Sequence, residues 1–446
     1  MVGMVGAPSL EGYRAAGNAG LPAPAGLLLS GGLPPLLSGS PWPGSQWPEA
    51  QWPESHWPES SGRPGLPPLA MRGRRTPGGE ERDRLLDWQP WRPRRRAAPY
   101  RVALLAPLSG PAGVWGPSCR TSALLASREI NRLGGVLGRE LELVFVDAGR
   151  TPEAVMAETV DLVVENEAEA VIGMHISAVR QALVGALKGR VPYVYTPVYE
   201  GGETTPGVFA IGETPSLQLK PAIAWLAEHR RARRWYLVGN DYVWPRVSHR
   251  AARRYITASG GTTLADDYIA FGDHDYGPCL ERIRRARPDA LLLSMVGEDC
   301  IRFSRAFAEA GLPRHILRIS TASEENTLLG IGADNTENLY FAAGYLACLR
   351  TPSNDAFLDH YSQAFGDEAP IPNTIGQSCY EGLKFYAALA QKADSLKLSD
   401  LIGAADGLVY QGARGQVALK RRSSRSDIYL AEADGLDFRV LARFPA

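Results

Sequence analysis

The sequence lacks the features typical of nucleic-acid-binding and membrane-spanning proteins. Its 48 Lys and Arg residues balance 48 Asp and Glu residues, so the formal net charge is zero and no overall field attracts a nucleic acid or an anionic membrane. No stretch of the 446 residues approaches the ~20 consecutive apolar residues of a transmembrane helix. Any binding must therefore come from a local site.

The sequence has few cysteines and lacks the residue spacings of common metal-binding motifs. The five cysteines include no Cys-x-x-Cys pair and no Cys/His spacing, which excludes a common zinc module. An odd number of scattered cysteines favours small buried side chains in a reducing compartment over a disulfide framework. The triplet Asp273-His274-Asp275 is a poor metal site, because adjacent residues rarely point at one centre.

Catalytic motifs are missing as well. There is no Gly-x-x-x-x-Gly-Lys-Ser/Thr loop and no Gly-x-Ser-x-Gly nucleophile elbow. The glycines at 110, 113 and 116 have the wrong spacing for a dinucleotide fingerprint. We therefore expect that this protein is not an enzyme.

Residues 1–98 are predicted to form a disordered tail rich in Pro, Gly and Arg, because they hold almost no periodic apolar pattern. A Trp-Pro-Glu repeat begins at Trp47, Trp52 and Trp57, and a basic stretch ends at residue 96. The first 30 residues contain no secretory signal, so we expect a cytoplasmic protein. The alternative is an exported or membrane-associated protein whose start codon is wrongly assigned, for example one that begins at Met71.

From residue 99 the pattern becomes that of an α/β fold with two Rossmann-like lobes and a hinge. Short apolar runs, typical of strands buried on both faces, alternate with helical periodicity. The predicted strands are 101–106, 141–146, 170–172, 193–195, 235–238, 263–268, 290–294, 339–342, 428–431 and 438–442. We assign residues 99–212 to the first lobe, with 346–410 returning to it, and residues 213–345 to the second, with 411–446 returning to it.

Polar and aromatic residues gather where these predicted strands end. Open α/β sheets bind ligands at the carboxyl ends of their strands, so these residues are the candidate ligand contacts. They are Ser109, His175, Ser177, Tyr195, Pro197, Tyr199, Tyr242, Trp244, Val296 and Thr321. Hydroxyl groups would orient a polar solute while aromatic rings cover its flat faces. The alternative for Tyr242 and Trp244 is that they only cap a helix and pack in the core.

Two segments carry a resemblance to a known family. They are Tyr195-Thr-Pro-Val-Tyr-Glu-Gly201 and Gly239-Asn-Asp-Tyr-Val-Trp-Pro-Arg246, supported by Ser177-Ala-Val-Arg-Gln-Ala182 and Asn338-Leu-Tyr-Phe341. From about residue 101 onward the chain resembles the type I periplasmic-binding-protein superfamily, and within it the amide and urea branch. That branch contains the amide-sensing negative regulator of aliphatic amidase operons and the urea-binding proteins of ABC importers.

The resemblance implies a venus-flytrap protein that closes on a small polar solute without a metal or an organic cofactor. It implies that Ser177, Tyr195 and Tyr199 hold the ligand from the first lobe, and that Tyr242 and Trp244 hold it from the second. Its partner would be a regulator protein or an ABC permease, and a homodimer is one candidate assembly. His175 and Pro197 depart from the family pattern. The alternatives are a receptor for branched-chain amino acids and an amidohydrolase.

Overall fold

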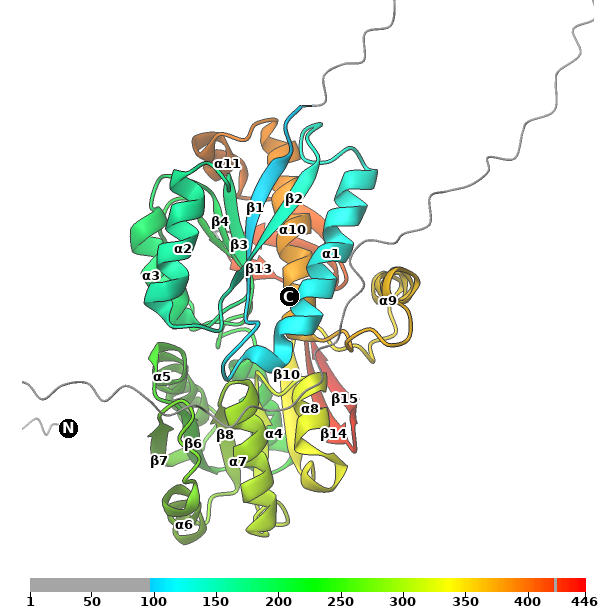
Figure 1. Cartoon of the computed structure of the whole chain (residues 1–446). Helices are drawn as coiled ribbons and strands as arrows, with labels where there is room; N and C mark the ends of the chain where they lie inside the picture. Colours follow the sequence, from blue (N-terminus) through cyan, green and yellow to red (C-terminus); the bar gives the residue numbers. More distant parts are fainter. Residues whose placement is uncertain (1–96, 421–422) are drawn as a thin grey trace, which may run out of the picture. The chain divides into compact units, whose positions relative to one another are not determined.

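The computed structural model describes residues 97–420 and 423–446, which form two α/β lobes (Figure 1). The Trp-Pro-Glu repeat and the basic stretch lie outside the described residues, as does the predicted tail up to residue 96. Within the described ranges, no helix is both long enough and apolar enough to cross a bilayer. The predicted fold class, two Rossmann-like lobes, is confirmed.

The first lobe is built on a parallel sheet with the strand order β2-β1-β3-β4-β5. Its strands are β1 (Tyr100–Ala106), β2 (Leu141–Asp147), β3 (Ala170–Gly173), β4 (Tyr193–Tyr195) and β5 (Val208–Ala210). Its helices are η1 (Gly113–Trp115), α1 (Gly116–Arg132), α2 (Pro152–Val164), α3 (Ser177–Leu187), α9 (Pro352–Phe365), α10 (Thr374–Ala393) and α11 (Leu398–Ala404).

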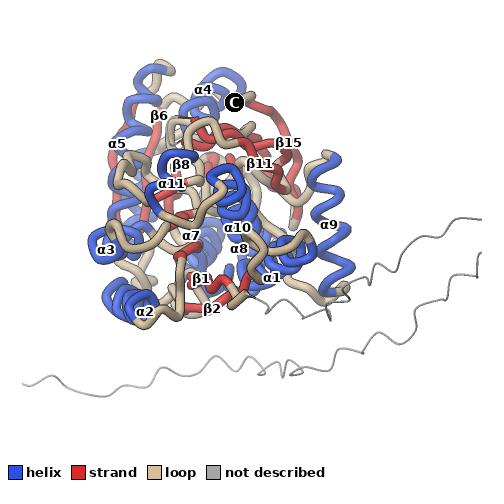
Figure 2. Tube along the Cα trace, turned by 90° about the horizontal axis from the view of Figure 1, so that it is seen from above, coloured by secondary structure: helices blue, strands red, loops and turns tan. Residues whose placement is uncertain are grey.

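Both faces of this sheet are covered, which explains the continuous apolar run of β1. Successive side chains of a strand point to opposite faces. Val102 and Leu104 accordingly pack in one core with α1 and α10, while Ala103 and Leu105 pack in another with α2 and α3. Helices α1 and α10 lie side by side although more than 200 residues separate them in the sequence (Figure 1 and Figure 2).

The second lobe repeats this plan. Its strands are β6 (Arg234–Asn240), β7 (Thr262–Ile269), β8 (Ala290–Ser294), β9 (Leu317–Ser320), β10 (Leu339–Ala343), β14 (Ile428–Asp434) and β15 (Asp437–Phe444). Its helices are α4 (Leu219–His229), α5 (Val243–Ala258), α6 (Gly277–Ala286), α7 (Gly297–Glu309), α8 (Glu325–Ile331) and η2 (Ala333–Asn335).

The parallel part of the second sheet has the order β7-β6-β8-β9-β10, which is the order of the first sheet. Strands β14 and β15 extend it in antiparallel orientation beyond β10. In each lobe the strand order reverses beside the first strand, β1 in one and β6 in the other. The loops that leave the carboxyl ends of the strands at this point form the usual ligand crevice of such sheets.

Three segments of the chain cross between the lobes. Residues 211–218 join β5 to α4, residues 344–351 join β10 to α9, and residues 426–427 lead into β14. A separate three-stranded sheet, made of β11 (Val409–Gly412), β12 (Gly415–Lys420) and β13 (Ser423–Arg425), precedes the third crossing. This sheet packs on α10 and the core of the first lobe, so of the returning C-terminal part only β14 and β15 join the second sheet.

The two lobes contact each other beside the crevice. The Trp115 indole N–H of the first lobe donates a 2.6 Å hydrogen bond to the carboxylate of Glu324 in the second. The backbone N–H of Glu298 donates to the carbonyl oxygen of Pro111 at 2.8 Å. Gly297 has φ +46°, and a Cβ atom there would lie 2.1 Å from the same Pro111 oxygen. A glycine is therefore required where α7 meets the first loop.

Among the residues that the structure describes, two histidines are buried, one in each lobe. His175 lies within 2.9 Å of the Tyr193 hydroxyl through Nε2, and His249 lies within 3.1 Å of the Ser294 hydroxyl through Nε2. Burial lowers the pKa of each imidazole to about 3. Both side chains are therefore neutral at physiological pH.

Replacing Gly297 with Ala is expected to separate the lobes, because the new methyl group collides with Pro111. Small-angle X-ray scattering should then give a larger radius of gyration than for the unmodified protein. Gly311→Ala is the matched control, since Gly311 has φ +68° and nothing within 4 Å of the added Cβ. It shares the left-handed strain of about 1–2 kcal/mol without the collision. Equal radii for the two variants would contradict this role of Gly297.

The buried histidines are expected to make the protein less stable in mild acid. The unfolded chain takes up protons on both imidazoles below pH ~6.5, whereas the folded chain does not until the pH approaches about 3. Above pH ~6.5 the two histidines therefore do not lower the free energy of unfolding. Below that pH the free energy of unfolding falls, by about 2 kcal/mol per histidine at pH 5. Chemical denaturation at pH 7.5 and at pH 5 should show that His249→Asn and His175→Asn each lose less free energy of unfolding between the two pH values than the unmodified protein does. The exposed His229→Asn should behave like the unmodified protein.

Candidate ligand-binding site

The crevice holds a cavity between the lobes. The first lobe contributes loops that follow β1, β3 and β4, and the second contributes loops that follow β6, β8 and β9. The lining residues are Trp115, Met174, His175, Ile176, Ser177, Tyr195, Pro197, Val198, Tyr242, Trp244, Val296, Ala322 and Ile375. We refer to this space as the first cavity.

Hydroxyl groups of the first lobe are held in a hydrogen-bonded chain. Ser177, the first residue of α3, donates to a carboxylate oxygen of Glu200 at 2.6 Å, and its Oγ lies 3.3 Å from the Tyr195 hydroxyl. Tyr195 in turn donates to the carbonyl oxygen of His175 at 2.9 Å. Burial raises the pKa of Tyr195 above its usual value, so the phenol keeps its proton. These hydroxyls are fixed in position at the cavity.

A buried ion cluster lies behind this chain. The Arg180 guanidinium pairs with Glu200 at 2.5 Å and also with Glu203. It lies over the rings of Tyr195 and Tyr199, 5.5 Å and 5.6 Å from their centroids. Arg180 and its two carboxylates are nearly inaccessible to solvent. This cluster orients Ser177 and the tyrosines but is itself already paired.

The second lobe contributes aromatic rings. Helix α5 begins directly after Tyr242, which precedes Trp244 in the same turn. The Tyr242 ring lies 6.2 Å from the Trp244 ring and 5.1 Å from the Phe271 ring. Trp244 is buried in the same core as Trp115 and Ile375 of the first lobe. Tyr242 and Trp244 therefore pack against their neighbours and also line the cavity, so core packing and a place at the cavity do not exclude each other.

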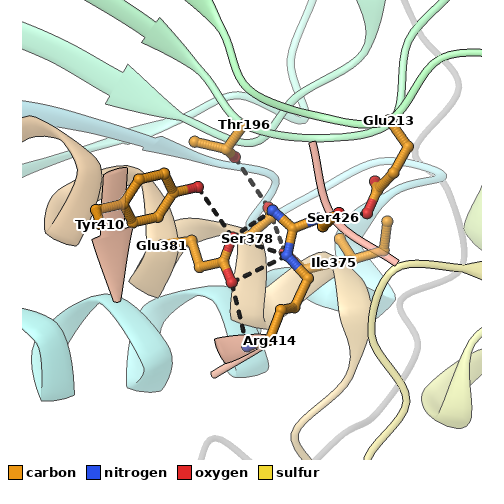
Figure 3. Close-up of polar contacts among 8 residues, drawn as sticks. All are labelled: Thr196, Glu213, Ile375, Ser378, Glu381, Tyr410, Arg414 and Ser426. Carbon is orange, nitrogen blue, oxygen red and sulfur yellow. Dashed lines mark hydrogen bonds and ion pairs between the residues drawn. The ribbon is translucent and has the colours of Figure 1, made fainter. Parts of the chain in front are cut away.

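A second cavity adjoins the first and shares Pro197, Val198 and Ile375 with it. Its remaining lining is largely polar and comes from both lobes, the crossing segments and helix α10. The residues are Thr196, Ile211, Glu213, Gln218, Thr321, Thr374, Gln377, Ser378, Glu381 and Arg414. Figure 3 shows the ionic part of this set, in which Arg414 lies between Glu381 and Glu213.

Most of the predicted ligand contacts are brought together. Seven of the ten line the first cavity: His175, Ser177, Tyr195, Pro197, Tyr242, Trp244 and Val296. Thr321 lines the second cavity, and Tyr199 lines a different, more open hollow beside Glu200 and Glu203. Ser109 is exposed and lines neither cavity, and its backbone N–H donates to Asp147 at 3.2 Å. A role of the ten residues in ligand binding stays a prediction.

Several lining residues were not predicted from the sequence. Trp115 could have been found, because it lies in the glycine-rich loop after the first strand. Ile375 and the polar residues of α10 had no local signal, since they belong to a helix distant in the sequence. Glu213 and Arg414 lie in a crossing segment and in a tight turn, which carry no periodic pattern.

No metal site accompanies the cavities among the residues that the structure describes. His274 of the triplet considered above lies 3.5 Å from Asp299 rather than sharing a centre with its neighbours. All five cysteines are free thiols, and four of them are buried.

Comparison with known proteins agrees with this architecture. The Leu/Ile/Val-binding protein BraC3 of Rhizobium johnstonii is 25% identical over 338 residues, covering 72% of this chain and 87% of the relative. A Pseudomonas aeruginosa protein named for binding leucine, isoleucine, valine, threonine and alanine is 21% identical over 61% of this chain and 73% of its own length.

Solved structures share the fold. A solute-binding protein of an ABC transporter from Rhodopseudomonas palustris, in complex with p-hydroxybenzoic acid, superposes with a TM-score of 0.70 at 19% identity, covering 78% of this chain and 98% of that one. The branched-chain amino acid transporter substrate-binding protein of Streptococcus pneumoniae, in complex with isoleucine, gives 0.68 at 20% identity, with 77% and 98% covered.

The sequence model of the periplasmic binding protein family matches residues 99–436. This match spans well over half of the chain and both lobes with their crevice. The family resemblance expected from the strand-end residues is thus confirmed, whereas the amide and urea branch stays a prediction. The chain belongs to the periplasmic binding protein family.

Proposed function

We propose that this protein is a receptor that closes on a small uncharged polar solute, such as a short-chain amide or urea. The observation that carries the proposal is the chemistry of the first cavity. Its lining offers hydroxyls and aromatic rings but no Asp, Glu, Lys or Arg side chain. The Arg180 guanidinium next to the lining is already paired with Glu200 and Glu203, so it is not free to hold a carboxylate. His175 is neutral because burial lowers its pKa to about 3.

Ligand contacts on both lobes would convert binding into closure. Ser177 and Tyr195 present hydroxyls from one side, and the rings of Tyr242 and Trp244 cover the other. A solute that touches both sides stabilises the closed form by its differential affinity for that form. An ABC permease or a regulator protein would then recognise the closed shape.

The second candidate is a receptor for branched-chain amino acids. It is favoured by the names of the curated relatives, which bind leucine, isoleucine and valine. An amino acid carries a carboxylate and an ammonium group, and burying such charges without partners is costly. The first cavity offers hydroxyls for the carboxylate but no acidic side chain for the ammonium group. The uncharged ligand therefore fits this cavity better.

Thermal denaturation of the full chain with candidate ligands tests the proposal. A ligand that binds only the folded protein raises its melting temperature. We expect acetamide, propionamide or urea to raise it, and leucine, valine and 4-hydroxybenzoate to leave it unchanged. A rise with the amino acids and none with the amides would replace the proposal by the second candidate. Turnover of an amide by the purified protein would revive the amidohydrolase alternative.

Removing single hydroxyls from the first cavity should weaken binding without unfolding the protein. Ser177→Ala and Tyr195→Phe each delete one hydrogen-bonding group and keep the packing. We expect each to raise the dissociation constant of the bound amide roughly 3- to 10-fold, as measured by isothermal titration calorimetry.

Ser399→Ala and Tyr429→Phe are the matched controls, since neither residue lines either cavity. They should bind with unchanged affinity. Unchanged affinity in Ser177→Ala and Tyr195→Phe as well would show that the solute binds elsewhere.

A further inference from the structure

The second cavity contains a buried ion cluster at the hinge. Glu381 of α10 is fully buried, and its two oxygens share the single N–H of Arg414 Nε, at 2.9 Å and 2.8 Å. Glu381 also accepts a hydrogen bond from the Tyr410 hydroxyl at 3.2 Å and pairs with Arg414 Nη2 (Figure 3). Both oxygens of Glu381 are therefore occupied.

Glu213 is the second carboxylate of the cluster, and only one of its two side-chain oxygens accepts a hydrogen bond from Arg414. Its Oε1 accepts a 2.6 Å hydrogen bond from Arg414 Nη1. No hydrogen bond from residues 97–420 or 423–446 reaches its Oε2, although Glu213 is 7% exposed and lines the second cavity. Because one guanidinium faces two carboxylates, the Arg414 cluster keeps one excess negative charge. The cavity thus offers an acceptor without a donor.

Gln377 offers a hydrogen-bond donor that has no acceptor within the described ranges. It is 2% exposed and lines the same cavity, and its side-chain nitrogen has no hydrogen-bond partner among the described residues. Helical spacing places Gln377 on the face of α10 that carries Glu381, four residues later. Folded proteins rarely leave a buried donor without an acceptor, so this group points to a ligand that accepts a hydrogen bond from it.

We propose that the second cavity receives the carboxamide or ureido group of the ligand. The carbonyl oxygen accepts from Gln377 Nε2, and an N–H donates to Glu213 Oε2. This inference rests on the proposed function and names the residues that set its specificity. The two cavities share Pro197, Val198 and Ile375, so the second N–H of a primary amide and its alkyl group would face the hydroxyls and rings of the first cavity.

The charges of the cluster decide between related ligands. A carboxylate meets the excess negative charge and has no N–H for Glu213. A fully N-alkylated amide retains the carbonyl group but also lacks an N–H. Ureas and amides that keep an N–H are uncharged and match both the free acceptor and the free donor.

The first test uses the unmodified full chain and titration calorimetry. Acetamide should bind at least about tenfold more tightly than N,N-dimethylacetamide, because a hydrogen bond to a carboxylate is lost with the second ligand. Acetate should not bind measurably. Equal affinity for acetamide and N,N-dimethylacetamide would overturn the assignment of Glu213.

Variants separate the lost hydrogen bond from simple crowding by the methyl groups. Glu213→Gln removes the excess charge, so the preference for acetamide over N,N-dimethylacetamide should shrink several-fold. A preference that persists unchanged would mean that size alone excludes the methyl groups, and the proposal would fail. The ratio of two affinities is insensitive to a general weakening of the hinge.

Gln377→Met tests the donor without touching the ion cluster. It keeps a similar volume and should weaken acetamide and N,N-dimethylacetamide alike, by about tenfold. Gln391→Met, on an exposed position of the same helix, is the control and should bind as the unmodified protein does. Unchanged affinity in Gln377→Met would refute the assigned donor.

Failure of this inference is distinguishable from failure of the proposed function. If neither amides nor urea bind the unmodified protein, the proposed function and this inference both fail. If they bind, and the Glu213 and Gln377 variants bind identically, the receptor function stands and only the second cavity is excluded as the amide compartment.

Discussion

The position of one lobe against the other depends on the Arg414 guanidinium. It touches a residue of each segment that crosses between the lobes: Glu213 of the first, Ser426 of the third at 3.2 Å, and Gly344 of the second, where an added Cβ would lie 2.9 Å from Arg414 Nη1. It is also paired with Glu381 of α10. Breaking a buried pair on one side leaves an uncompensated charge and typically costs about 3–5 kcal/mol. The crossing segments are thus linked electrostatically around one guanidinium.

The same ion cluster lines the second cavity, so the proposed amide site adjoins the segments that cross between the lobes. A ligand group beside Glu213 contacts a crossing segment directly, while Trp115, Gly297 and Glu324 form contacts between the lobes beside the first cavity. Most polar groups around the first cavity satisfy one another, as Ser177 and Glu200 do. The unpaired groups of the second cavity are therefore the places where a solute adds most to the stability of the closed form.

Much of the fold could be predicted from the sequence because the parallel strands are covered on both faces. The apolar run of β1 and the helical periodicity of α1, α2 and α3 locate these elements to within a few residues. Strands β5 and β9 were not predicted, because three or four residues carry too little pattern to distinguish a strand from a loop. Helix α4 was also missed, although it has 11 residues. Seven of ten predicted site residues line one cavity, since strand ends at a switch point must converge.

By itself, the sequence determined the local structure: buried strands, amphipathic helices, and the hydroxyl and aromatic side chains at strand ends. These depend on neighbours within a few residues, so periodicity and turn chemistry reveal them. Only the tertiary structure decided which distant groups meet. The pairing of Glu213 with Arg414, some 200 residues later, and the unpaired nitrogen of Gln377 follow from how three crossing segments pack against α10. Such packing depends on burial and on charge compensation in three dimensions, and no local pattern encodes it.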